Sequence, residues 1–221
     1  MNKDVVILDY QLGNLFSVKQ ACDKVGLNCK ISSEKKDVQN ADAIILPGVG
    51  AFAEAMRNLK SLDLIDPIKD SVAAGKPLFG VCLGQQLLFT ESEEFGSSPG
   101  LNLITGVIKK FPSFTVLNSK VKIPQIGWNH IYHPSNNWVN TPLQNVQQNT
   151  YVYFVHSYYV QPENVENVLS FTNYDGIEYC SAVVKKPNIF ATQFHPEKSG
   201  ELGVGMYKEW ARLFKLIPNE K

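Results

Sequence analysis

The 221-residue chain has no excess charge of either sign, because 21 lysine and arginine residues balance 21 aspartate and glutamate residues. This balance gives no electrostatic reason to expect binding to nucleic acid or to an anionic membrane. Long apolar runs are also missing. The run Val5–Leu8 near the start is far too short for a signal peptide or a membrane span. We therefore expect a soluble, cytoplasmic protein that binds neither nucleic acid nor membrane.

Cysteine and histidine are scarce, with four residues of each. No two cysteines are spaced as Cys-x-x-Cys or as a disulfide framework, which argues against a structural metal site and against a disulfide-rich secreted protein. We expect reduced thiols, no metal and no cofactor. The four cysteines are Cys22, Cys29, Cys82 and Cys180.

The chain does contain enough apolar sequence, 44% of its residues, for a full core, and we expect a single domain over residues 1–221. In the first half, short β-branched runs alternate with segments of helical apolar spacing, which predicts a parallel sheet covered by helices. The predicted strands are Val5–Leu8, Leu27–Ile31, Ala43–Leu46 and a run ending at Val81, and the predicted helices are Leu15–Val25, one from near Ala51, and Leu64–Ala74. Sites in such sheets gather at the carboxyl ends of strands, so the turns after Leu8, Leu46 and Val81 should line one crevice.

From about Pro99 the pattern changes to strands with few helices between them, closed by a helix over Glu201–Leu216. These strands are predicted over Leu103–Phe111, Val121–Trp128, Tyr151–Val160, Asn167–Thr172, Ile177–Val184 and Ile189–Phe194. The polar stretch Asn136–Asn149 is predicted to be a surface loop or the tip of a hairpin. The fold class that follows is α/β, a three-layer sandwich with a mostly parallel central sheet flanked by helices, plus an antiparallel β extension.

Cys82 lies at the centre of the pattern Gly80-Val-Cys-Leu-Gly84, between an apolar strand and a helix-compatible run. This strand–turn–helix layout is that of a nucleophile elbow with cysteine in place of serine. The glycines allow backbone to crowd a turn whose central residue is strained. A thiol held there can act as a nucleophile, whereas a buried cysteine after a core strand is the simpler alternative.

A cysteine nucleophile needs a base, and His195 is the best placed of the histidines because it ends a predicted strand and is followed by Pro196 and Glu197. Glu197 can return to the imidazole and orient it, as in a nucleophile–base–carboxylate triad. Without Cys82, His-Pro-Glu would be no more than a polar turn before a helix. The other histidines are weaker candidates. His156 lies in an apolar run typical of a core residue, and His130 and His133 flank Ile131-Tyr132, with His133 before Pro134 in a predicted surface turn.

An acyl-transfer site also needs donors for the oxyanion. The backbone N–H of Leu83, just after the nucleophile, is one candidate. The turn Pro47–Gly50 follows a strand of the same sheet and supplies Gly48, Val49 and Gly50 as further candidates, although glycine-containing turns of this kind are common.

Together these stretches resemble the class I (triad-type) glutamine amidotransferases, whose pattern is a Gly-x-Cys-x-Gly-x-Gln elbow and a later His-Pro-Glu. Further motifs, recurring in order along nearly the whole chain, resemble the glutaminase subunits of imidazole glycerol phosphate synthases. They are Asp9–Asn14, Pro47–Gly50, Ser92–Glu94, Gly127–Asn129, His156–Tyr158 and His195–Ser199.

The resemblance implies that L-glutamine is hydrolysed through a γ-glutamyl thioester on Cys82, with His195 passing the thiol proton to departing ammonia. It also implies a substrate pocket formed by Gln86 at the α-amino and carboxylate end, Glu94 at the α-ammonium, and the backbone of Ser157 and Tyr158.

By the same resemblance, Gly48–Gly50 form an oxyanion strand that becomes competent when a partner engages. The implied partner is a cyclase subunit with a (β/α)₈ barrel, which receives ammonia through a tunnel and makes imidazole glycerol phosphate and an aminoimidazole carboxamide ribotide in histidine biosynthesis. The heterodimer interface would include Asn14, Trp128 and Lys198.

Gln11 departs from the family pattern, which commonly has glycine there, so a turn that demands positive φ would strain it. Three alternatives remain open at this point. The chain could be a paralogue that supplies ammonia for amidino-sugar synthesis in surface polysaccharides, a thiol hydrolase or peptidase of the same superfamily, or a non-catalytic scaffold subunit with an inert Cys82.

Overall fold

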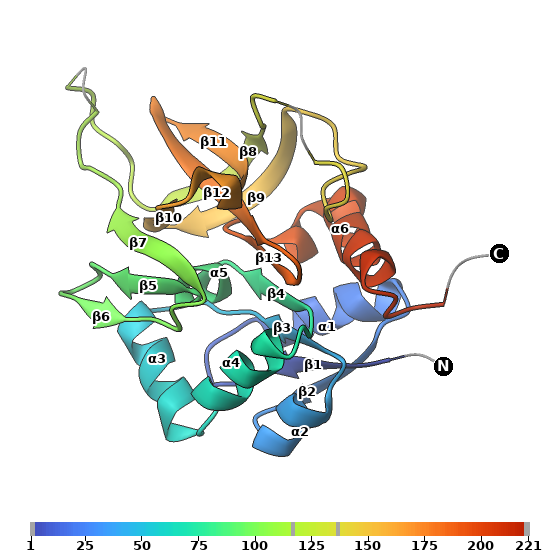
Figure 1. Cartoon of the computed structure of the whole chain (residues 1–221). Coiled ribbons are helices and arrows are strands. Elements are labelled where there is room, and N and C mark those ends of the chain that lie inside the picture. Colours follow the sequence, from blue (N-terminus) through green and yellow to red (C-terminus); the bar gives the residue numbers. More distant parts are fainter. Residues whose placement is uncertain (1–2, 116–117, 136–137, 219–221) are drawn as a thin grey trace.

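The computed structural model describes residues 3–115, 118–135 and 138–218. Its central sheet begins with five parallel strands (Figure 1). In spatial order they are β2 (Asn28–Ser32), β1 (Asp4–Leu8), β3 (Ala43–Leu46), β4 (Leu78–Val81) and β13 (Ile189–Thr192). All four residues of β3 and of β4 are buried, as expected for strands covered on both faces.

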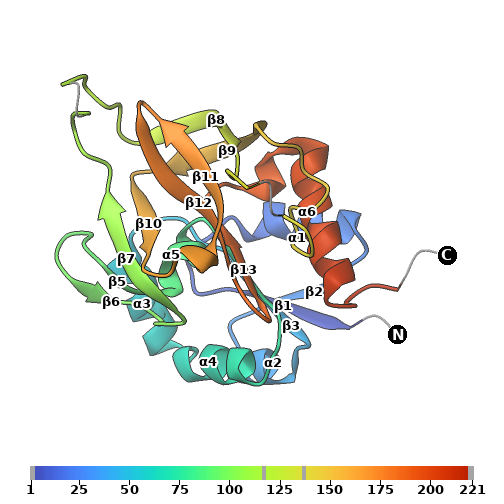
Figure 2. The same cartoon turned by 45° about the horizontal axis from the view of Figure 1, so that its top comes forward.

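Helices cover both faces of this parallel half (Figures 1 and 2). Side chains of successive strand residues point to opposite faces, so Ile7 packs in one core cluster with Trp210, and Leu8 packs in another with Phe52. The first cluster is covered by α1 (Leu15–Lys24) and α6 (Gly200–Leu213), and the second by α2 (Lys35–Asn40), α3 (Phe52–Ser61), α4 (Ile65–Ala73) and α5 (Leu83–Leu87).

The sheet continues beyond β13 with mostly antiparallel strands, which lie above and to the left of the parallel half in Figure 1. In order they are β12 (Ile177–Lys185), β10 (Tyr158–Pro162), β7 (Ile104–Lys110), β5 (Phe89–Ser92) and β6 (Ser98–Pro99), with β11 (Val168–Tyr174) paired to β12 and β5 parallel to β7. A separate two-stranded sheet joins β8 (Gln125–Ile131) and β9 (Thr150–His156). Short 3₁₀ turns lie at η1 (Val165–Asn167) and η2 (Pro196–Lys198). The predicted α/β sandwich with an antiparallel extension is confirmed.

Several details differ from the sequence-based expectation. The strand predicted over Val121–Trp128 is found as β8, over Gln125–Ile131. The predicted strand Tyr151–Val160 is two strands separated by Ser157, because β9 pairs with β8 whereas β10 pairs with β7 and β12. Helix α2 and the short strands β5 and β6 were not expected, and the last helix ends at Leu213 instead of Leu216.

The polar stretch Asn136–Asn149, predicted to be a surface loop or the tip of a hairpin, lies in the connection between the antiparallel strands β8 and β9. The hairpin prediction is therefore confirmed, but the stretch is not wholly at the surface. Residues 136 and 137 lie outside the described residues, but beyond them Trp138 and Leu143 are buried. The Trp138 Nε1–H donates to the Leu169 carbonyl oxygen at 2.7 Å, which ties this stretch to β11.

Candidate active site

Cys82 stands on the turn between β4 and α5 with φ 55° and ψ −109°, a region that few non-glycine residues adopt. The predicted strained elbow is therefore confirmed. Gly84 makes the turn possible, because a Cβ at this position would lie 1.7 Å from the Leu46 carbonyl oxygen. At Gly80 a Cβ would lie 3.0 Å from Ala191 Cβ, so that glycine allows close packing against β13.

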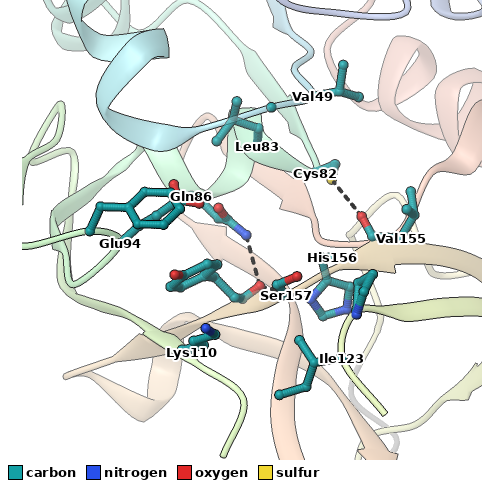
Figure 3. Close-up of a pocket in the computed structure, with 14 residues that line it drawn as sticks. Val49, Cys82, Leu83, Gln86, Glu94, Lys110, Ile123, Val155, His156 and Ser157 are labelled. Carbon is teal, nitrogen blue, oxygen red and sulfur yellow. Dashed lines mark hydrogen bonds between the residues drawn. The ribbon is translucent and has the colours of Figure 1, made fainter.

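The thiol of Cys82 is held among backbone and amide groups of neighbouring strands. The Cys82 N–H donates to the Thr192 carbonyl oxygen at 2.7 Å, which fixes the turn to β13. The sulfur lies 3.9 Å from the Val155 carbonyl oxygen (Figure 3) and 3.7 Å from Gln193 Nε2. The side chain is buried, at 6% exposure, yet lines a pocket.

His195 and Glu197 form a buried pair, with His195 Nδ1 2.7 Å from Glu197 Oε1 and both side chains at most 2% exposed. Pro196 begins η2 between them and fixes the turn that brings the carboxylate back to the ring. Among the described residues, Nε2 of His195 has no hydrogen-bond partner. Burial opposes protonation, but the Cys82 sulfur and then Glu197 outweigh it and raise the pKa of His195 to about 10.

His156 also lies at this site, in a different state. Burial lowers its pKa to about 3, so the ring is neutral. Its Nδ1 lies 2.8 Å from the Tyr158 carbonyl oxygen, which can only accept, and Nε2 lies 3.2 Å from the Tyr179 hydroxyl. The hydrogen-bonded core histidine expected from the sequence is thus what the structure shows. His130 and His133 do not line the pocket.

A cavity of about 470 Å³ opens beside Cys82. All four predicted substrate-binding residues line it, namely Gln86, Glu94, Ser157 and Tyr158. Gln86 Nε2 donates to the Tyr158 carbonyl oxygen at 2.9 Å (Figure 3) and to Gln193 Oε1 at 3.0 Å. Glu94 Oε2 accepts from the Phe52 N–H at 2.6 Å, at the first residue of α3.

The predicted oxyanion residues meet at the elbow, but one predicted donor, the Leu83 N–H, is already engaged within the protein. The Leu83 N–H donates to the Gly48 carbonyl oxygen at 3.4 Å. The buried Tyr10 hydroxyl donates to the Pro47 carbonyl oxygen at 2.5 Å. Burial, with the nearby Cys82 sulfur, raises the pKa of Tyr10, so this donor stays protonated. Val49 and Gly50 line the cavity.

The first turn does demand positive φ at Gln11, whose φ is 69°. The strain expected for a non-glycine residue is therefore present. The Gln11 N–H donates to Asp9 Oδ1 at 2.9 Å, which holds the turn in this conformation.

The three residues predicted at a partner interface lie at or near the protein surface. Trp128 is 56% exposed and packs edge-on against Tyr153, and Lys198 Nζ lies 5.8 Å from the centre of the same Tyr153 ring. Asn14 Oδ1 accepts from the Ser17 N–H at 3.4 Å and caps α1. We refer to Trp128, Tyr153 and Lys198 as the aromatic patch.

Two polar residues at the site were missed by the sequence reasoning. Gln193 is fully buried and bridges Cys82 and Gln86. Its signal was a lone amide inside the apolar run Ile189–Phe194. Lys110 lines the cavity from the end of β7, and only the pairing of β7 with β10 could have placed it there.

Over the described residues, no helix is long and apolar enough to span a membrane. In the same part of the chain, no group of three or more histidine, cysteine, aspartate or glutamate side chains could hold a metal ion.

Known proteins match this chain along nearly its whole length. The family model for glutamine amidotransferase class-I matches residues 6–209. Imidazole glycerol phosphate synthase subunit HisH 1 of Legionella pneumophila (strain Lens) is 42% identical over 95% of this chain and 99% of its own. Imidazole glycerol phosphate synthase subunit HisH of Gloeothece citriformis (strain PCC 7424) is 45% identical over 96% of this chain and 97% of its own.

Solved structures share the fold at lower identity. The crystal structure of a glutamine amidotransferase superposes with a TM-score of 0.67 at 16% identity, over 95% of this chain and 98% of that one. The structure of PurLQS from Thermotoga maritima gives a TM-score of 0.68 at 18% identity, over 97% of this chain and 98% of that one. At these identities the likeness concerns the fold alone.

Proposed function

The chain belongs to the glutamine amidotransferase class I family, and on that premise we propose that it is the glutaminase subunit of an imidazole glycerol phosphate synthase, working in histidine biosynthesis. The observation that carries the chemistry is that Cys82, which lines a cavity of about 470 Å³, neighbours the buried His195–Glu197 pair, which does not itself line the cavity. A cavity of this size suits a small ligand.

The proposed reaction begins with attack of the Cys82 sulfur on the side-chain amide carbon of L-glutamine. The raised pKa of His195 keeps its ring protonated while the thiolate attacks, and the ring then gives its proton to the departing ammonia. A γ-glutamyl thioester remains on Cys82. Water, deprotonated by the now neutral His195, attacks this thioester and releases glutamate, while Glu197 keeps the ring oriented.

The substrate would lie with its amide at Cys82 and its amino-acid end toward Glu94. Figure 3 shows Glu94 on the side of the pocket away from Cys82. Its second carboxylate oxygen is available for the α-ammonium, since the first accepts from Phe52. Gln86 and the backbone of Ser157 and Tyr158 would complete the wall along the substrate.

The oxyanion strand would need to move before fast turnover. The Leu83 N–H is bonded to the Gly48 carbonyl oxygen, and a carbonyl oxygen facing that position repels a developing oxyanion. We therefore propose that the backbone of residues 48–50 flips when a partner docks. The flip would replace the Gly48 carbonyl oxygen at this position with a backbone N–H that can donate to the oxyanion. The positive φ of 110° at Gly50 supports this, because glycine tolerates the large backbone rotations involved.

The proposed partner is the cyclase subunit, a (β/α)₈ barrel that takes ammonia by a tunnel. The aromatic patch supports a docking surface on this chain, since aromatic residues are enriched at interfaces and Trp128 is exposed and packed against Tyr153. Helix α1, capped by Asn14, contacts η2, and a Cβ on Gly13 just before the helix would lie 3.9 Å from Gly48 Cα of the oxyanion strand.

The test is synthesis by the assembled complex with glutamine or with ammonium salt as nitrogen source. Cys82→Ser should abolish the glutamine-dependent rate and leave the ammonia-dependent rate unchanged, because the synthase site is on the other chain. Cys180→Ser is the matched control. Its buried sulfur contacts the Ala182 carbonyl oxygen and does not line the cavity, so it should keep both rates.

Loss of both rates in Cys82→Ser would contradict ammonia transfer between subunits. Equal glutamine-dependent rates in Cys82→Ser and the wild type would show that Cys82 is not the nucleophile. A glutamine-independent thiol hydrolase activity would favour the superfamily alternative. A cyclase gene among histidine genes beside this one would support the pathway, whereas sugar-modifying neighbours would support the amidino-sugar paralogue.

A further inference from the structure

Lys110 is the last residue of β7 and pairs directly with Tyr158 at the start of β10. Directly paired residues in antiparallel strands project to the same face of a sheet, with their Cβ atoms close together. Both side chains therefore point into the cavity beside Cys82, and both line it. Lys109, the preceding residue, pairs with Tyr159 and points to the opposite face.

The cavity wall carries two formal charges of opposite sign. Glu94 is its carboxylate and Lys110 its ammonium, among fourteen lining residues. Figure 3 shows both on the side of the pocket away from Cys82. Burial and then the Glu94 carboxylate raise the pKa of Tyr158, so Glu94 lies near the residue that pairs with Lys110. Within the described chain, the Lys110 ammonium takes part in no hydrogen bond or ion pair, whereas Glu94 already accepts from Phe52.

An α-amino acid presents an ammonium and a carboxylate on one carbon atom. Glu94 complements the ammonium but repels the carboxylate, so a pocket with Glu94 alone would bind a neutral-ended substrate about as well as a free amino acid. A cation beside Glu94 removes that repulsion and supplies a charge-assisted hydrogen bond.

We propose that Lys110 is the specificity-determining residue that binds the α-carboxylate of the substrate and restricts the site to free glutamine. This rests on the proposed function, since it assumes that glutamine lies with its amide at Cys82. A glutamine residue within a peptide has no free carboxylate there, so the separate charges of Glu94 and Lys110 disfavour its binding.

The test uses two electrophilic glutamine analogues on the intact chain, 6-diazo-5-oxo-L-norleucine and its methyl ester. The Cys82 thiolate displaces dinitrogen from the protonated diazoketone and forms a thioether. Peptide mass spectrometry follows this labelling over time. The two reagents differ only at the α-carboxylate, so the ratio of their labelling rates isolates the contribution of that charge.

The wild type should prefer the free acid by about 10- to 100-fold at low reagent concentration, the range of a charge-assisted hydrogen bond. Lys110→Gln should lose this preference, because labelling by the free acid slows while labelling by the ester changes little. Lys110→Arg should retain most of the preference. Lys109→Gln should behave as the wild type. For glutaminase turnover by the complex, Lys110→Gln should raise KM with little change in kcat.

If Cys82 in the wild type reacts with the free acid but Lys110→Gln keeps the full preference, the role of Lys110 is wrong while the proposed function stands. If neither reagent labels Cys82 of the wild type, the proposed function fails, and the role of Lys110 with it. If both rates fall equally in Lys110→Gln, with unchanged circular dichroism, Lys110 shapes the pocket and does not bind the carboxylate.

Discussion

At the scale of single residues, two buried histidines near Cys82 have opposite protonation states for identifiable reasons. His195 has the Cys82 sulfur and the Glu197 carboxylate as neighbours, and these raise its pKa to about 10 against the effect of burial. His156 has neutral hydrogen-bond partners and its pKa falls to about 3, mainly through burial. The surroundings therefore leave His195 able to give a proton at neutral pH and His156 unable to take one.

We expect His195→Asn to lower glutaminase kcat on the order of 10³-fold or more, since triad members act as a unit. His156→Asn should cost no more than about 10-fold, because the neutral ring supports the pocket wall through Tyr158 and Tyr179 and does not transfer protons. Steady-state kinetics of the complex measure both variants. A larger loss in His156→Asn would show that the base has been misassigned.

The pH dependence has a definite sign. Because the pKa of His195 is raised above its unfolded value, its contribution to stability is fully present below about pH 6.5 and is lost as the pH rises through about 10. The unfolding free energy should therefore fall between pH 7 and pH 10 more steeply in the wild type than in Cys82→Ala, which lacks the sulfur that holds the proton. Denaturant titrations at several pH values test this, and parallel pH profiles would contradict it.

At the scale of elements, the elbow depends on close contact between α5 and β3. A Cβ on Gly84 would lie 1.7 Å from backbone oxygen of Leu46, which cannot move aside as a side-chain end can. Gly84→Ala should therefore destabilise the protein by about 2 kcal/mol or more, as overpacking does.

Gly205→Ala is the matched control, since Gly205 lies inside α6 and a Cβ added there would meet nothing within 4 Å. It should stabilise the protein by up to about 1 kcal/mol through helix propensity. Urea unfolding followed by circular dichroism measures both variants. Equal changes in unfolding free energy in the two variants would show that the elbow does not depend on the close contact at Gly84.

The elements that could be predicted are those with a strong local signal. Val5–Leu8 and Ala43–Leu46 are wholly apolar and became buried parallel strands. Helix α2 gave little signal because Val38 is its one buried residue. The Gly-x-Cys-x-Gly spacing located the elbow. The pairing of His195 with Glu197 could be predicted because the two residues are joined by one local turn. Lys110 could not be placed, because its position follows from cross-strand register between segments distant in the sequence.

At the scale of the whole molecule, the site lies where the parallel sheet gives way to the antiparallel extension. Strands β4 and β13 supply Cys82 and the His195 turn from the parallel half. Strands β7 and β10 supply Lys110 and Tyr158 from the extension. The pocket therefore depends on both parts of the sheet. The aromatic patch, formed by the separate β8–β9 sheet and η2, is the surface proposed to meet the partner.

If Trp128 lies at the centre of the proposed interface, Trp128→Ala should weaken binding of the proposed cyclase partner by about 30-fold or more. The control is Val165→Ala, because Val165 is 73% exposed on η1 and is not part of the aromatic patch. Isothermal titration calorimetry with the cyclase gives both affinities. Unchanged binding by Trp128→Ala would show that the interface lies on another face of the protein.

The central claim is that Cys82 carries a covalent glutamyl group which the His195–Glu197 pair helps to form. The direct measurement is peptide mass spectrometry after the assembled complex has been mixed with L-glutamine and quenched in acid within a turnover. The account predicts a γ-glutamyl thioester on the peptide that contains Cys82, and its absence in His195→Asn. Release of ammonia at the full rate with an unmodified Cys82 peptide at every quench time would contradict it.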